Sequence, residues 1–233
     1  LENVVAVAAG INHSLAMDEN GKVYSWGLNS EGQSTVPDGL ENIVAVSAGS
    51  SHSLAMDSDG HVYAWGDNSY GQISVPDDLS NVVAVAAGMN HSLAMDDNGK
   101  LYAWGQNRSG QIENPSSLEH ITAIAPGETH SLALQSDGKI YAWGSNSYDQ
   151  ITVPDGLESV VAVAAGMDHS MTLDSEGKVY AWGRNTDRQS TVPDDLNDVT
   201  AIAAGEAHSL ALDSNGTIYC WGRNSDSQCA APE

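Results

Sequence analysis

The sequence contains no phenylalanine, only two cysteines and only eight lysines and arginines in 233 residues. Aspartate and glutamate together number 31, so the formal net charge is −23. Such a chain repels phosphate backbones and anionic membrane surfaces, which argues against nucleic-acid and membrane-surface binding. It also lacks an apolar run long enough to cross a bilayer, and no stretch shows a convincing helical period. These absences leave an acidic, predominantly β protein as the expectation.

What the sequence has instead is a repeat of 39 residues. The dipeptide His-Ser recurs at His13, His52, His91, His130, His169 and His208. The dipeptide Trp-Gly recurs with the same step at Trp26, Trp65, Trp104, Trp143, Trp182 and Trp221. Residues that recur in one context are first of all architecture, so we expect these histidines and tryptophans to be scaffold. We predict a single domain over 1–233, built from repeats 1–39, 40–78, 79–117, 118–156, 157–195 and 196–233.

Each repeat has the residue types and turn signals of short β-strands. In the first repeat the four candidate strands are "NVVAVAAG", "HSLAMD", "KVYSWG" and "QSTVP". A short acidic turn such as "DENG" joins the second and third strands, and only two or three residues join the first and second, so these three form a meander. Four antiparallel strands repeated six times predict an all-β, six-bladed β-propeller with four strands per repeat. Two alternatives are a shifted phase, in which the fourth strand belongs to the neighbouring blade, and an open solenoid.

The connections between strands differ in chemistry at the two ends of each predicted blade. We call the Gly-to-His loops and the Trp-Gly-to-Gln loops the variable loops, because their residues differ between repeats. The acidic turns and the "VPDGLEN" links lie at the other end and carry most of the carboxylates. Arginine, tyrosine and methionine are enriched at protein interfaces, and binding residues concentrate on loops of a rigid scaffold. We therefore predict partner binding at Ile11, Asn12, Tyr70, Met89, Asn90, Arg108, Glu128, Tyr148, Met167, Asp168, Arg184, Arg188, Glu206 and Arg223.

The repeated histidines do not predict catalysis or metal binding. A serine follows each histidine, but no third group is available in the pattern to orient a base, so we predict no catalytic residues and no enzymatic activity. One histidine per repeat does not supply converging metal ligands. The four-residue acidic turns are too short for a calcium loop, which needs twelve residues. We accordingly expect no metal and no cofactor.

Cys220 and Cys229 both lie in the last repeat and flank the connection after its third strand. Two interpretations stay open: a disulfide that pins the C-terminal segment, or two buried thiols. A disulfide would stabilise by about 2–3 kcal/mol on the chain-entropy model. It would also imply an oxidising setting, so we predict an extracellular or secreted protein.

The pattern "VVAVAAGxxHSLAMDxxGKVYAWGxNxxGQ" of the first three repeats resembles the repeat of the regulator of chromosome condensation family, and the resemblance covers the whole chain. The compact unit ending in "TVP" is most similar to bacterial members of the β-lactamase inhibitor type, which are usually seven-bladed. The resemblance implies partner binding rather than catalysis.

Three departures narrow this expectation. The chain lacks the inserted segments and basic surface of the eukaryotic exchange factor. It lacks the tryptophan that the plant ultraviolet-B receptor places between the Gly and the His. It also lacks the aromatic residues that the inhibitors carry in the same loop. We predict a non-enzymatic scaffold that binds a protein partner, with self-association by stacking of the acidic and arginine-bearing ends, or glycan binding, as alternatives.

Overall fold

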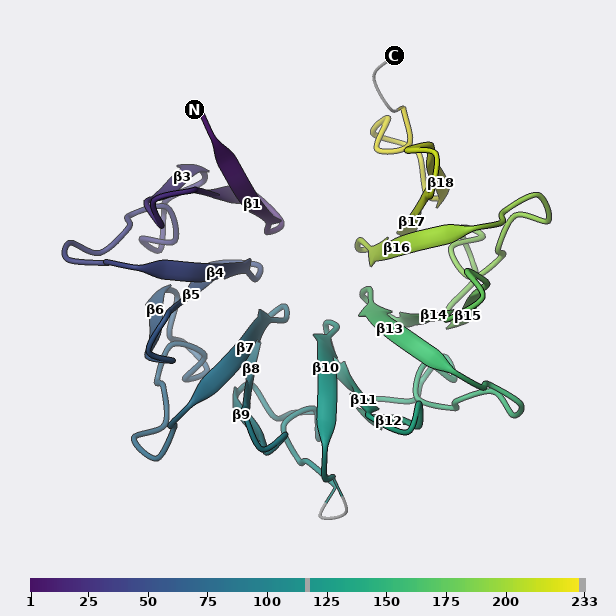
Figure 1. Cartoon of the computed structure of the whole chain (residues 1–233), viewed down its shortest axis with the longest axis horizontal. Helices are drawn as coiled ribbons and strands as arrows, with labels where there is room; N and C mark the ends of the chain where they lie inside the picture. The colour runs from purple at the N-terminus through teal and green to yellow at the C-terminus, as the bar shows by residue number, and fades with distance from the viewer. Residues whose placement is uncertain (116–117, 231–233) are drawn as a thin grey trace. The chain divides into compact units, whose positions relative to one another are not determined.

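A computed structural model of the chain describes residues 1–115 and 118–230. These residues form eighteen strands in six antiparallel sheets of three strands each (Figure 1). No helix in these ranges is long and apolar enough to cross a membrane. The prediction of an all-β, six-bladed propeller is confirmed, and we call each three-stranded sheet a blade.

The chain divides into two compact units. Unit 1 comprises residues 1–108 and 112–119, and unit 2 comprises residues 109–111 and 120–233. The strands of unit 1 are β1 (Val4–Ala9), β2 (His13–Asp18), β3 (Val23–Gly27), β4 (Ile43–Ala48), β5 (His52–Asp57), β6 (Val62–Gly66), β7 (Val82–Ala87), β8 (His91–Asp96) and β9 (Leu101–Gly105). The strands of unit 2 are β10 (Ile121–Pro126), β11 (His130–Gln135), β12 (Ile140–Gly144), β13 (Val160–Ala165), β14 (His169–Asp174), β15 (Val179–Gly183), β16 (Val199–Ala204), β17 (His208–Asp213) and β18 (Ile218–Gly222). The single domain over 1–233 stays a prediction.

Each blade is the predicted meander, with the His-Ser strand in the middle. In the first blade β2 pairs with β1 on one side and with β3 on the other, with His13 opposite Gly27. The middle strand is also the most buried, and Leu15, Leu54 and Leu132 have no exposed surface. Consecutive blades pack side by side within a unit, since β4 contacts both β1 and β2. The apolar core therefore lies between neighbouring blades rather than within one sheet.

The predicted fourth strand is wrong. Residues 33–37 and their equivalents form turns and irregular backbone, and each described blade has three strands. The reason lies in Gln33, which is fully buried. Its backbone carbonyl accepts hydrogen bonds from Ser53 Oγ at 3.0 Å and Trp65 Nε1 at 2.9 Å, both in the next repeat. A carbonyl used in this way is not available to a β-ladder, so the segment connects blades instead of extending one.

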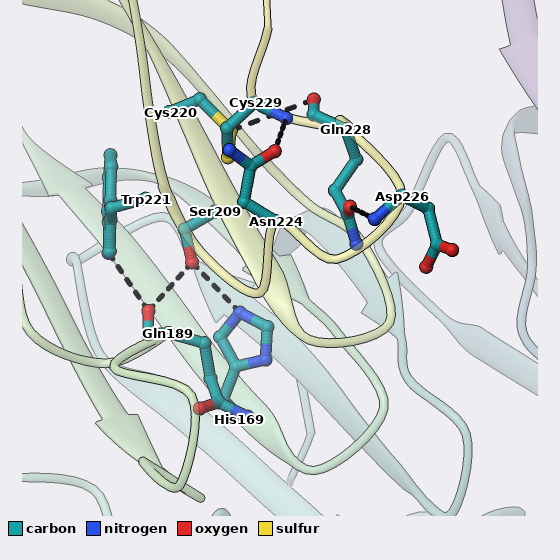
Figure 2. The surroundings of a disulfide bond; sticks show 9 residues. All are labelled: His169, Gln189, Ser209, Cys220, Trp221, Asn224, Asp226, Gln228 and Cys229. Carbon is teal, nitrogen blue, oxygen red and sulfur yellow. Dashed lines mark hydrogen bonds between the residues drawn. A yellow bond between two sulfur atoms is a disulfide. The ribbon is translucent and has the colours of Figure 1, made fainter.

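The recurring His, Ser, Gln and Trp residues form one hydrogen-bonded relay between consecutive repeats. Figure 2 shows it in unit 2, where His169 Nε2 lies 3.0 Å from Ser209 Oγ, and Ser209 Oγ donates to the Gln189 carbonyl at 2.8 Å. Trp221 Nε1 donates to the same carbonyl at 2.9 Å. Because the serine has a single hydroxyl hydrogen, which it gives to the glutamine carbonyl, the imidazole Nε2 must be the donor to the serine. The histidines and these tryptophans are scaffold, as predicted.

Burial keeps the relay histidines uncharged. His52, His130 and His169 have no exposed surface. The pKa of each is lowered to about 4, mainly by loss of hydration and to a smaller extent by the neighbouring histidine of the series. Burial also lowers the pKa of His13 and His208. Neutral imidazole is therefore the form that the fold requires.

Trp26 is the exception among the tryptophans. Trp26 is 48% exposed, whereas the other five tryptophans are 6–8% exposed. Each of those five donates to a glutamine carbonyl of the preceding repeat. The prediction that every tryptophan is interior scaffold is wrong for this residue.

In five of the six repeats, the aspartate that opens the acidic turn is a structural group; the fourth repeat has Gln135 there. Asp18 is 7% exposed, and its Oδ1 accepts hydrogen bonds from the backbone N–H groups of Asn20 and Lys22. The bond from the Lys22 N–H is the main reason that the pKa of Asp18 lies below its usual value. Asp57, Asp96, Asp174 and Asp213 hold their turns with equivalent bonds. The freely exposed negative charge at this end is consequently smaller than the sequence suggests.

Candidate functional site

The two kinds of variable loop lie together at one end of every blade. In each repeat, the backbone N–H of the residue after Trp-Gly donates to the carbonyl of the residue before the histidine, at 2.7–2.9 Å. In the first repeat these residues are Leu28 and Asn12. The bond follows from the meander, because it continues the ladder between the second and third strands. The pairing of these loops within each repeat agrees with the sequence-based prediction.

The Trp-Gly-to-Gln loops are held rigid by two side chains that recur in every repeat. The glutamine Oε1 accepts from the backbone N–H two residues earlier, at 2.9 Å in all six repeats. The second residue after each Trp-Gly is an asparagine, such as Asn29 in the first repeat. Its side-chain Oδ1 accepts a hydrogen bond from the backbone N–H five residues later, at 2.9–3.4 Å. These bonds replace regular secondary structure, so the loops present their variable residues from a fixed backbone.

Two of the predicted tyrosines form stacked pairs with predicted arginines. Tyr70 and Tyr148 occupy the same position of repeats two and four and are 39% and 45% exposed. The guanidinium of Arg108 lies 5.1 Å from the centre of the Tyr70 ring, and that of Arg184 lies 5.1 Å from the Tyr148 ring. Each pair joins two consecutive repeats within one unit. Stacking on an aromatic ring holds a guanidinium in place while its edge remains available for hydrogen bonds.

The variable loops of unit 1 carry apolar side chains and little charge. Ile11 is 53% exposed, and Asn12 beside it is also exposed. Met89 and Asn90 are half-buried, and the Met89 carbonyl accepts a hydrogen bond from Ser50 Oγ. An exposed leucine, Leu28, joins this set; its residue is 46% exposed. The prediction omitted it, although its position varies from Leu to Arg among the repeats.

The variable loops of unit 2 are charged and mostly paired internally. Asp168 accepts a bond from Arg184 at 3.3 Å, and Arg223 lies 3.6 Å from Glu206. Glu128 is half-buried, and its pKa is raised by burial and by the carboxylates of Asp168 and Glu206. Acidic groups thus lie close together at the Gly-to-His loops of this unit.

The remaining predicted residues of unit 2 are accessible. Arg188 is exposed on a loop position with φ 66°, and Met167 is half-buried with its N–H bonded to the Glu206 carbonyl. All fourteen predicted binding residues are therefore half-buried or exposed. Their role in binding stays a prediction.

The two cysteines form a disulfide, which selects the first of the two interpretations. Cys220 on β18 and Cys229 are bonded, with their Cα atoms 5.2 Å apart (Figure 2). The N–H of Cys229 also donates to Asn224 Oδ1 at 2.9 Å, so the bridge reinforces the loop-holding bond of the last repeat. Within residues 1–115 and 118–230, no group of three or more His, Cys, Asp or Glu side chains is arranged to hold a metal ion.

Comparison with known proteins assigns the family. The family model of the RCC1-like domain matches residues 1–233. The chain belongs to the RCC1-like domain family. No curated protein sequence matches it. Among solved structures, Prp20p from Saccharomyces cerevisiae is similar with a TM-score of 0.80 and 26% identity, over 94% of this chain and 72% of Prp20p.

Two further structures share the fold of this RCC1-like domain. Human WBSCR16 is similar with a TM-score of 0.80 and 25% identity, over 96% of this chain and 77% of the human chain. The ectodomain of the Physcomitrella patens receptor kinase CR4 has a TM-score of 0.78 and 22% identity, over 94% of this chain and 64% of the ectodomain. This last likeness shows the fold alone.

Proposed function

We propose that this RCC1-like domain is a non-enzymatic scaffold that binds a protein partner through its variable loops. The observation that carries the proposal is the pair of Tyr–Arg stacks, Tyr70–Arg108 and Tyr148–Arg184, on loops whose backbone is fixed by buried glutamines. Tyrosine and arginine are enriched among the few residues that dominate the binding energy of protein interfaces. A rigid loop adds little ordering cost when the partner binds.

The relatives support a binding role. The structure of Prp20p was described together with its binding to Gsp1p and histones, and yeast RCC1 (Prp20) was also solved bound to Kap60. These are properties of the yeast protein, and the partner of this chain is a separate question. The narrower resemblance to the β-lactamase inhibitors stays a prediction.

The test is affinity capture of partners with the whole chain as bait, followed by hydrogen-exchange mapping of the complex. We expect protection at the variable loops, and we expect Tyr148→Ala and Arg188→Ala to weaken capture. Asp18 and Asp57 are unsuitable controls because they hold turns, so the matched controls are the exposed acids Asp59 and Glu158, each changed to alanine. Protection confined to the acidic turns and links, or equal weakening by all four variants, would refute the proposal.

The disulfide supports our proposal of an extracellular location, since such bonds persist in oxidising compartments. Self-association and glycan binding remain alternatives. Light scattering at low salt and a glycan array test them directly.

A further inference from the structure

The two Tyr–Arg pairs are built from different positions of the repeat. Arg108 is the third residue after the Trp-Gly dipeptide of its repeat, whereas Arg184 directly follows the Trp-Gly dipeptide of its own repeat. Both nevertheless place the guanidinium 5.1 Å from the ring of the tyrosine in the preceding repeat. The two pairs therefore offer an internal comparison of what a guanidinium held on this tyrosine can bind.

In unit 2 the stacked guanidinium already holds a carboxylate. Arg184 Nη1 lies 3.3 Å from Asp168 Oδ2, and Arg184 Nε donates to Thr186 Oγ1 at 3.0 Å. The Asp168 side chain is 13% exposed. This pair is satisfied within the chain, so a partner would have to displace Asp168 to use the arginine.

In unit 1 the equivalent guanidinium has no such partner. Arg108 is exposed, and over residues 1–115 and 118–230 it takes part in no ion pair. The carboxylates closest in the sequence to the two residues of the pair are Asp67, before Tyr70, and Glu113, after Arg108, and both have other hydrogen-bond partners. Asp67 accepts from Ser69 and from Gln72 Nε2, and Glu113 accepts from Asn107 Nδ2 at 3.1 Å. Arg108 is thus a pre-positioned cation with an unused hydrogen-bonding edge.

We propose that the Tyr70–Arg108 pair is an anchor for a carboxylate side chain of the protein partner. The inference rests on the proposed function and specifies the partner's chemistry: an aspartate or glutamate flanked by apolar residues. The carboxylate takes the place on Arg108 that Asp168 takes on Arg184. The flanking apolar side chains contact the Tyr70 ring, whose residue is 39% exposed. A planar guanidinium recognises a carboxylate through two parallel N–H bonds, which a lysine cannot reproduce.

The net charge of the chain makes this anchor selective. An acidic partner segment is repelled at long range by a protein of charge −23. It binds only where a single carboxylate meets a fixed cation and apolar surface together. We therefore expect short segments with one acidic residue, and we expect added salt to weaken their binding little, because screening also reduces the long-range repulsion.

The experiment is selection of a random peptide phage library on the whole immobilised chain, repeated on Arg108→Gln. We expect peptides enriched in one Asp or Glu beside apolar residues, and we expect that enrichment to disappear with the variant. A selected peptide, made synthetically, should bind Arg108→Gln and Arg108→Lys about tenfold or more weaker than the parent chain. The peptide with its acid changed to the amide should lose a similar factor on the parent chain and little on Arg108→Gln.

Lys100→Gln is the matched control. Lys100 lies in the same repeat, carries the same charge and stacks on Tyr102 at 4.1 Å, but it follows the acidic turn at the other end of the blade. We expect it to bind the peptide as the parent chain does. Circular dichroism of each variant verifies that it is folded.

The outcomes separate the two proposals. Peptides that bind the variable loops without an acidic residue, or equal binding by Arg108→Lys, would overturn the carboxylate anchor and leave the proposed function standing. Binding of acidic sugars on a glycan array, with no acidic peptide selected, would also overturn the anchor. Failure to select any peptide, together with failure to capture a protein, would overturn both.

Discussion

The buried histidine relay makes the stability of this protein sensitive to mild acid. His52, His130 and His169 have pKa values lowered from 6.5 to about 4 in the folded chain. The unfolded chain therefore binds more protons than the folded chain between these two values. By linkage, the free energy of unfolding is fully retained above pH 6.5 and falls as the pH decreases towards 4.

The magnitude follows from the size of the shift. Near pH 5 each of these histidines is mostly protonated in the unfolded chain and mostly neutral in the folded chain, which costs about 2 kcal/mol per histidine. The three together cost about 6 kcal/mol, and a typical domain is stable by about 5–15 kcal/mol. We expect the folded state to be marginal near pH 5, above the range in which the aspartates titrate.

The assay is urea unfolding followed by tryptophan fluorescence at several pH values, in enough salt to screen the surface charge. His52→Gln retains a donor for Ser92 but no longer titrates, so it should remove about 2 kcal/mol of the destabilisation near pH 5. His120→Asn is the control, because His120 is exposed and asparagine tolerates its φ of 53°. An unfolding free energy that does not change from neutral pH to pH 5 would refute the reasoning. So would imidazole NMR signals of His52, His130 and His169 that titrate near 6.5 in the folded protein.

Three further predictions concern the scaffold. Trp65→Phe removes the donor to the Gln33 carbonyl and should lower the free energy of unfolding by about 2–3 kcal/mol, whereas Trp26→Phe, at an exposed site, should cost less than about 1 kcal/mol in the same denaturation assay. Ser159 has φ 54°, a region that asparagine tolerates better, so Ser159→Asn should raise the melting temperature through a gain of about 0.5–1 kcal/mol, and a decrease would contradict this assignment. Reduction of the Cys220–Cys229 bridge should add two hydrogens to the intact mass and destabilise by about 2–3 kcal/mol, with amide exchange accelerated in the last repeat; unchanged exchange there would show that the bridge does not constrain that segment.

The repeat pattern predicted the blades because a blade is a local structure. The glycine-closed acidic turn and the short Gly-to-His loop each connect strands that are adjacent in the sequence, so residue type and turn length suffice to identify the meander. The same reasoning failed for the fourth strand, where "QSTVP" has the composition of a strand. The competing bonds to Gln33 come from Ser53 and Trp65, 20 and 32 residues later.

The sequence predicted which loop residues are exposed for binding, but not which of them contact one another. Exposure of Tyr70 and Arg108 could be anticipated, because both lie in loops whose residues vary between repeats. Their stacking could not, since the two residues occupy different positions of their repeats and meet only when consecutive blades pack. The turn aspartates show the opposite error. The acidic turn predicts an exposed charge at Asp18, but its carboxylate is nearly buried and satisfied by backbone N–H groups.

The period of 39 residues, the strand order within a blade and the scaffold role of the recurring histidines all follow from the chain's linear pattern. Packing between blades decided three further features. These are the unpaired guanidinium edge of Arg108, the exposure of Trp26 and the absence of a fourth strand from each described blade. The physical reason is that a blade's own hydrogen bonds are satisfied between residues close in the sequence. The relay and the stacked pairs, in contrast, join side chains and carbonyls of different repeats, and their partners exist only after the apolar faces of neighbouring blades have come together.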